Sequence, residues 1–301
     1  MAYPFSHLFH PFSTDMSFNF KIITLLITGF LLQGCETALD ISNVTLRERI
    51  VINALLNNKD QVQISVSKST SIDNKVKPGP LLGAEVTITD DSGNKITCTY
   101  NIISEKYEAA IVPIAGKTYS IFVRANGFPD ASASLSIPNT AGTKSSMWKD
   151  STSFDSSGFP QGTLTVYISD KKYENNYYRL TIYYYDNVTT EWNVLDPPTT
   201  DADIQSQALK TEDGGIVFSD RYFNGMNKEI NFLTAFGYGN GTPKFLVVNE
   251  SLGEEYYKFF KSLDDYKKSG GLFQEPNGVY SNIEHGLGIA AGSSIQRDTI
   301  H

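Results

Sequence analysis

Alternation of apolar and polar residues is the feature that most constrains how this chain can fold. Between residues 47 and 138, apolar residues recur at every second position in runs separated by turn residues, as in "VQISVS" at residues 62–67. A period of two places one set of side chains on the buried face of a strand and the other set in water. Several short strands within about 90 residues predict a small β-sandwich over residues 45–138.

The second half of the chain is predicted to be a further β-rich domain, a sandwich or a barrel, over residues 162–301. Its longest strand lies in "NNYYRLTIYYYD" at residues 175–186, and aromatic residues favour the pleated, half-buried surface of a sheet. Other strands are predicted at residues 163–169, 216–220, 229–236 and 244–249. The intervening segment 139–161 is rich in Ser, Thr, Gly and Pro, and we expect it to be a linker between the two domains.

One amphipathic helix, at residues 252–269, is predicted among these strands. Its apolar residues recur at steps of three and four, which places them on one stripe that can face the sheet. These residues are Leu252, Tyr256, Phe259, Leu263 and Tyr266. Ser251 and Glu254 match the S-x-x-E capping box that begins many helices, and the Gly270-Gly271 pair can end this one.

The N-terminal segment "KIITLLITGFLLQGCETALD" has the layout of a secretory signal peptide. Lys21 precedes a mostly apolar run, Ile22 to Leu32, which is too short to cross a bilayer as a helix, since crossing takes roughly 20 residues. The motif Leu32-Gln33-Gly34-Cys35 at the end of the run resembles a bacterial lipobox, in which the cysteine sulfur receives a lipid before cleavage on its amino side.

We therefore expect a lipoprotein signal peptide at residues 1–34, a lipidated Cys35, and a tether at residues 35–44. The segment before Met16 would make the basic part of a signal peptide unusually long. This favours Met16 as the translation start.

The charge argues against a nucleic-acid-binding protein, and the cysteine content argues against a disulfide-rich scaffold. A net charge of −8 with no basic stripe argues against a nucleic-acid partner. If Cys35 carries the lipid, Cys98 has no second cysteine with which to form a disulfide scaffold. Cys98 alternates with polar residues in "KITCTYNI", so it is predicted to be an inert thiol on the core face with Ile96 and Tyr100.

Residues typical of catalytic sites are scarce beyond the predicted signal peptide. Only two of the four histidines, His285 and His301, lie there, although histidine is the usual acid–base group near neutral pH. The sequence contains no G-x-S-x-G, no H-E-x-x-H, no Walker-type glycine loop and no zinc-spaced Cys/His cluster. We assign no catalytic residue, no metal and no cofactor, and the sequence favours a non-enzymatic protein.

The tyrosine-rich strand is instead the best candidate for contact with a partner. Alternation places Arg179, Tyr183 and Tyr185 on one of its faces. Tyrosine and arginine are enriched in binding hot spots because they bury a large area and keep a polar group. In the alternative interpretation the tyrosines are structural and cover the helix and the rim of a barrel.

Several segments, in order along the chain, resemble a family of uncharacterised lipoproteins of Bacteroidota-type bacteria that is known only as a domain of unknown function. They are "RIVINALL", "LLGAEVTITDDSGN", "GKTYSIFVRANGF", "NYYRLTIYYYD", "FSDRYFNG", "LGEEYYKFFKSL" and, most specifically, "FQEPNGVYSNIEHGLGIAAG". Genes of this family often lie beside those of TonB-dependent outer-membrane receptors. The first half of the chain also resembles the immunoglobulin-like or transthyretin-like modules of exported proteins, which implies a fold and not an activity.

The resemblance and the residue patterns together lead to one hypothesis with two alternatives. We expect an outer-membrane lipoprotein, anchored through Cys35 on either face of that membrane, that assists a TonB-dependent receptor in nutrient capture or uptake without catalysis. The alternatives are a lipid-anchored hydrolase and a cell-surface structural or adhesive module. The scarcity of histidine argues against the hydrolase, and a neighbouring receptor gene would argue against the adhesive module.

Overall fold

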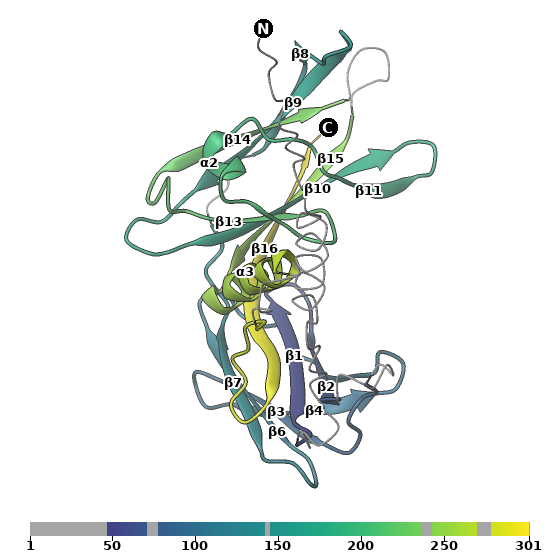
Figure 1. Ribbon diagram of the computed structural model, residues 1–301, viewed down its shortest axis with the longest axis vertical. Helices are drawn as coiled ribbons and strands as arrows, with labels where there is room; N and C mark the ends of the chain where they lie inside the picture. Colours follow the sequence, from purple (N-terminus) through teal and green to yellow (C-terminus); the bar gives the residue numbers. More distant parts are fainter. Residues whose placement is uncertain (1–46, 71–77, 142–144, 236–242, 270–277, 301) are drawn as a thin grey trace, which may run out of the picture. The chain divides into compact units, whose positions relative to one another are not determined.

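The structure is a computed structural model, and it describes residues 47–70, 78–141, 145–235, 243–269 and 278–300 (Figure 1). Strands make up 51% of it and helices 8%, which confirms the prediction of a mainly β protein. Its large sheets are not closed into a barrel. The predicted signal peptide, Cys35 and the tether lie outside the described residues. In the described ranges, no helix is long and apolar enough to cross a membrane.

Residues 47–301 belong to one compact unit, which begins with the strands predicted to form a sandwich. These strands are β1 (Ile50–Asn57), β2 (Val62–Lys68), β3 (Glu85–Asp90), β4 (Lys95–Asn101), β5 (Lys106–Ala109), β6 (Thr118–Arg124) and β7 (Ala131–Ser136). Burial follows the predicted alternation, since every second side chain of β1, starting at Ile50, is buried. Buried side chains of all seven strands form one apolar core.

The rest of the chain adds further strands and two helices. They are β8 (Met147–Phe154), β9 (Pro160–Ser169), β10 (Tyr177–Asp186), β11 (Glu191–Leu195), α2 (Ala202–Gln205), β12 (Leu209–Lys210), β13 (Ile216–Ser219), β14 (Asn227–Thr234), β15 (Phe245–Leu252), α3 (Glu254–Lys268) and β16 (Leu287–Ile300). β8 lies inside the segment that we expected to be a linker, where it pairs with β9. The polar composition of this segment suits β8 because β8 is an edge strand and is mostly exposed.

β16 connects the two predicted domains through backbone hydrogen bonds. It pairs in parallel with β1 and antiparallel with β15, within a thirteen-stranded sheet of order β12-β13-β10-β15-β16-β1-β2-β5-β4-β3-β6-β7, with β11 on β10. A second sheet, β14-β9-β8, shares an apolar core with β10 and β15 through side chains such as Ile168, Phe232, Leu180 and Val247. The division of the chain into two domains stays a prediction, but its two regions share one sheet.

The helix α3 begins at Glu254, later than predicted, and the expected capping box does not form. Ser251 belongs to β15, where its hydroxyl accepts a hydrogen bond from the backbone N–H of Ala141 at 3.0 Å. The N-cap is Gly253, which makes no side-chain cap hydrogen bond. The local pattern assigned Ser251 to the helix cap, but Ser251 is instead paired with Ser294 in the sheet, so the helix begins after it.

Small residues in β16 allow neighbouring backbones to approach closely. A Cβ atom on Gly292 would lie 2.2 Å from the carbonyl oxygen of Ser136, and one on Gly288 would lie 2.1 Å from that of Ile52. Both contacts involve backbone atoms, which cannot rotate away as a side chain does. The glycines of the "GLGIAAG" segment are therefore required by packing.

Gly292→Ala should lower the free energy of unfolding by about 1–3 kcal/mol, because the added methyl group forces the backbone at Ser136 to move. Gly278→Ala is the matched control, since a Cβ there meets no atom within 4 Å, and its effect should stay within about 0.5 kcal/mol. Urea unfolding followed by circular dichroism measures both. Equal stability of the two variants would show that β16 and the end of β7 are not packed this closely.

Cys98 lies on the core face of β4, which confirms its predicted position with Ile96 and Tyr100. Burial raises the pKa of this free thiol to about 11. At neutral pH it therefore stays protonated, and the protonated thiol is the unreactive form.

Candidate functional site

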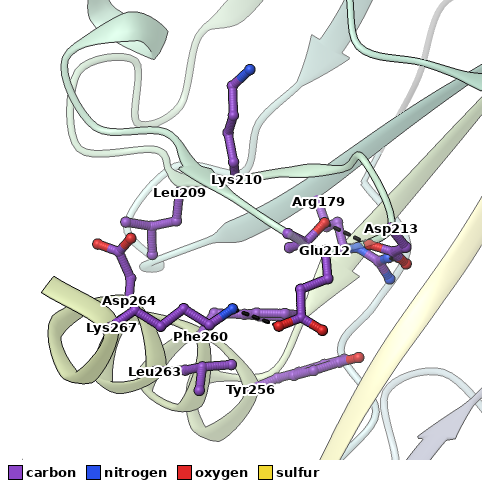
Figure 2. A pocket seen from close by; sticks show the side chains of 11 residues that line it. Arg179, Leu209, Lys210, Glu212, Asp213, Tyr256, Phe260, Leu263, Asp264 and Lys267 are labelled. Atoms are coloured by element: carbon purple, nitrogen blue, oxygen red, sulfur yellow. Dashed lines mark hydrogen bonds and ion pairs between the residues drawn. The ribbon is translucent and has the colours of Figure 1, made fainter. Parts of the chain in front are cut away.

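The candidate site begins with a hollow of about 310 Å³ between α3 and the turn that joins β12 to β13 (Figure 2). Its apolar lining comes from Leu209, Tyr256, Phe260 and Leu263, and its polar lining from Arg179, Lys210, Thr211, Glu212, Asp213, Asp264 and Lys267. The helix α3 positions three of the four apolar residues, of which Tyr256 and Leu263 belong to the stripe that the sequence predicts, and β12 positions Leu209. The strand β10 positions Arg179.

Arg179 forms two ion pairs inside this site. Its Nη1 donates to Glu250 at 2.8 Å, and its Nη2 donates to Asp213. The Arg179 side chain is only 13% exposed and that of Glu250 only 9%, whereas that of Asp213 is 58% exposed. Ser293 donates a further hydrogen bond to Glu250 at 3.1 Å. The charge of Arg179 is therefore balanced within the protein.

The pKa values in the hollow are shifted away from neutrality. Burial acts to lower the pKa of Arg179, but the nearby carboxylates of Glu250 and Asp213 outweigh it, and the pKa is raised. Burial acts to raise the pKa of Asp213, but hydrogen bonds from Thr211 and Arg179 outweigh it, and the pKa is lowered. Burial raises the pKa of Tyr256 to about 12. None of these three groups is therefore suited to proton transfer near pH 7.

A salt bridge joins the two walls of the hollow. Lys267 of α3 reaches Glu212 of the β12–β13 turn at 2.7 Å (Figure 2). Among the described residues, no cluster of three or more His, Cys, Asp or Glu side chains could hold a metal ion. The salt bridges of Lys267 with Glu212 and of Arg179 with Asp213 both attach the β12–β13 turn to the rest of the protein, which is a structural role.

Loss of the buried partner of Arg179 should cost far more stability than loss of the exposed one. Glu250→Ala leaves a buried guanidinium without its main counter-charge and should lower the free energy of unfolding by about 3–5 kcal/mol. Asp213→Ala removes a mostly exposed partner and should cost less than about 1 kcal/mol. Urea denaturation measures both values. Similar losses for the two variants would contradict the claim that Glu250 contributes more to stability than Asp213 does.

The second part of the site is one face of the hairpin formed by β10 and β11. Tyr183 lies opposite Val194, and Tyr185 lies opposite Trp192 with ring centroids 5.3 Å apart in an edge-to-face arrangement. The Lys244 ammonium lies 5.4 Å from the centre of the Tyr185 ring. Trp192 and Val194 are 41% and 45% exposed, so these four apolar side chains form an accessible surface, here called the hairpin face.

The hollow and the hairpin face share the β12–β13 turn. Gly214 in this turn has a φ of +80°, and a Cβ atom there would lie 2.3 Å from a methyl carbon of Val194. Asp213, the residue before Gly214, is held by Arg179. The ion pair between Arg179 and Asp213 thus holds a turn that packs directly against the exposed hairpin face.

The structure brings together two of the three residues predicted to contact a partner. Tyr183 and Tyr185 are half-buried neighbours on the hairpin face. Arg179 points to the same side of β10, but the buried Thr181 separates it from them and its guanidinium is paired. Sequence reasoning missed Trp192 and Val194, although their alternation with Glu191 and Asn193 in a short strand was a signal that could have revealed them.

Comparison with known proteins places the chain in a family. A family model described as "Domain of unknown function (DUF4249)" matches residues 36–299. The chain therefore belongs to this family, a class of protein for which the family model states no activity. No curated protein has a sequence that matches this chain significantly.

Among solved structures, one match is a crystal structure of a mutant of Salmonella alpha-2-macroglobulin. It is 7% identical in sequence, with a TM-score of 0.24, over 85% of this chain and 15% of the other. The chain thus spans less than a sixth of the length of that protein.

Proposed function

We propose that this protein is a lipid-anchored accessory of a TonB-dependent outer-membrane receptor, which assists in nutrient capture or uptake without catalysing a reaction. In this proposal the lipid is carried by Cys35, and the hairpin face is the surface that contacts the receptor. The hairpin face is the observation that carries the proposal, because it offers partly exposed aromatic side chains on a pair of hydrogen-bonded strands.

The composition of the hairpin face supports a contact with another protein. Tryptophan and tyrosine are the residues that most often dominate binding energy, since each buries about 150–250 Å² and retains a polar group. Lys244 adds a cation at the edge of the surface. The two tyrosines and Trp192 are held by cross-strand pairing, so little side-chain freedom would be lost on binding.

The family match supports the expected anchor. It begins at residue 36, directly after Cys35. It therefore starts one residue after the boundary that cleavage on the amino side of Cys35 would produce.

Substitutions on the hairpin face test the proposed contact. Trp192→Ala and Tyr185→Ala should each weaken the association with the receptor by roughly 30-fold or more, as expected for a hot-spot loss of about 2 kcal/mol. The measurement is affinity purification of the tagged protein from detergent-solubilised outer membrane, with quantification of the receptor barrel that accompanies it.

Tyr266→Ala on α3 is the matched control, because Tyr266 is similarly exposed but lies outside the hairpin face. It should leave the yield of receptor unchanged, and the thermal melts of all three variants should resemble that of the wild type. If no receptor barrel accompanies the wild type, the proposed function is wrong. If the Trp192 and Tyr185 variants retain the receptor, the hairpin face is not the contact.

A further inference from the structure

Two neighbouring isoleucines are almost fully exposed in the turn between β4 and β5. Ile102 is 81% exposed and Ile103 is 92% exposed. Single exposed apolar side chains are common on proteins and need no explanation. Two adjacent aliphatic side chains that both extend into water are a small apolar patch, and such a patch calls for one. The two side chains here are called the isoleucine tip.

The fold does not need the isoleucine tip. The turn is formed by polar groups, since the Asn101 side chain accepts a hydrogen bond from the Ile103 N–H at 2.9 Å and donates one to Glu108 at 2.9 Å. Ser104 also donates to Glu108, at 2.7 Å. Neither isoleucine belongs to the apolar core of this region, and β-branched residues are not favoured in turns.

The isoleucine tip lies at the end of the sandwich where the described chain begins. β1 starts at Ile50, which pairs with Lys68 at the end of β2. β5 runs antiparallel to β2, with Ile64 opposite Tyr107, so the turn that precedes β5 points toward the same end as Lys68. The tip and the start of β1 therefore share one end of the sheet, here called the tether end.

Other groups at the tether end suit a lipid surface. Leu82 is 65% exposed, and its neighbour Leu81 is hydrogen-bonded to Val66, near the end of β2. Arg47 and Arg49 are exposed there, while Lys68 is paired with Glu48 at 2.8 Å. Glu105, in the turn between β4 and β5, carries a negative charge, which an anionic lipid would repel. Exposed aliphatic side chains with nearby arginines are the combination that binds the interface of an anionic bilayer.

The length of chain before the tether end also favours a membrane. The segment from Cys35 to Arg47 spans at most roughly 40 Å when fully extended. A lipid on Cys35 would therefore keep the tether end near the bilayer, whereas β16 leads away from it to the hairpin region.

We propose that the tether end rests on the membrane and that Ile102 and Ile103 insert at the boundary between headgroups and acyl chains. This inference rests on the proposed lipid anchor. Because the lipid of such an anchor already gives stable attachment, the isoleucine tip would determine the orientation of the protein and not its affinity for the membrane. The hairpin face, which lies near the C-terminal end of β16, would then be at a distance from the lipid.

A probe on the isoleucine tip tests this orientation. The full-length lipidated protein carrying Ile103→Cys is labelled with an environment-sensitive fluorophore and reconstituted in vesicles of phosphatidylethanolamine and phosphatidylglycerol. Cys98 is buried and does not compete for the label. Val188→Cys is the matched control, because Val188 is also a β-branched residue in a hairpin turn and is 91% exposed.

We expect the emission of the Ile103→Cys probe to shift to the blue and to be quenched several-fold by spin-labelled lipid, while the Val188→Cys probe stays in water. If both probes stay in water in a protein that mass spectrometry shows to be lipidated, the inference is wrong and the proposed anchor stands. If the Ile103→Cys probe is shielded only when receptor is added, the tip binds protein and the inference is wrong. An unmodified Cys35 in the mature protein would overturn the anchor and this inference together.

Discussion

β16 lies between β1 and β15, and its backbone hydrogen bonds join the two halves of the sheet. Its first residues, from Leu287 to Ser293, pair with β1, and its last residues, from Ser293 to Ile300, pair with β15. At about 3.3 Å per residue, a strand of this length spans roughly 45 Å. Without it, β1 and β15 would each present an unpaired edge. Because Gly288 and Gly292 have no side chain, the backbone of β16 can lie close to the backbones of β1 and β7.

The position of β16 has a consequence for function, because it separates two different surfaces. One is the tether end, where the described chain begins and where the isoleucine tip is exposed. The other is the hairpin face, which lies on β10 and β11 next to β15. Between them Arg179, which is buried and paired with Glu250, also pairs with Asp213 in the turn that packs against Val194. A buried ion pair adds little net stability but fixes one arrangement of its neighbours, and we propose that role here.

The sequence was informative about strands and poor at predicting which strands pair. Alternation correctly predicted β1, β2 and the tyrosine-rich strand β10, because a period of two reflects burial on one face. The expectation that β10 is the longest strand was wrong, since β10 has 10 residues and β16 has 14. Alternation did not predict β16 at all, because most residues of its first half are small or apolar and do not alternate with polar ones. Its pairing with β1 joins strands more than 200 residues apart, and local patterns carry no information on such contacts. The capping box failed for a related reason, because the β15 ladder uses Ser251.

The candidate site was predictable to a similar extent. Alternation placed Arg179, Tyr183 and Tyr185 on one side of β10, and the structure agrees with that placement. The burial of Arg179 depends on Glu250 and Asp213, which come from separate parts of the chain and which no local pattern connects to it. Trp192 and Val194 lie in a strand of only five residues, in which alternation is a short but usable signal that the sequence analysis did not apply.

Native-state hydrogen exchange tests most directly the central claim that β16 makes the tether end and the hairpin region one cooperative body. The account predicts that the slowest amides of β1, β15 and β16 exchange with the same free energy of opening, equal to that of global unfolding. Protection that persists in β1 under conditions where β15 and β16 have already exchanged would contradict it, because the two regions would then unfold independently.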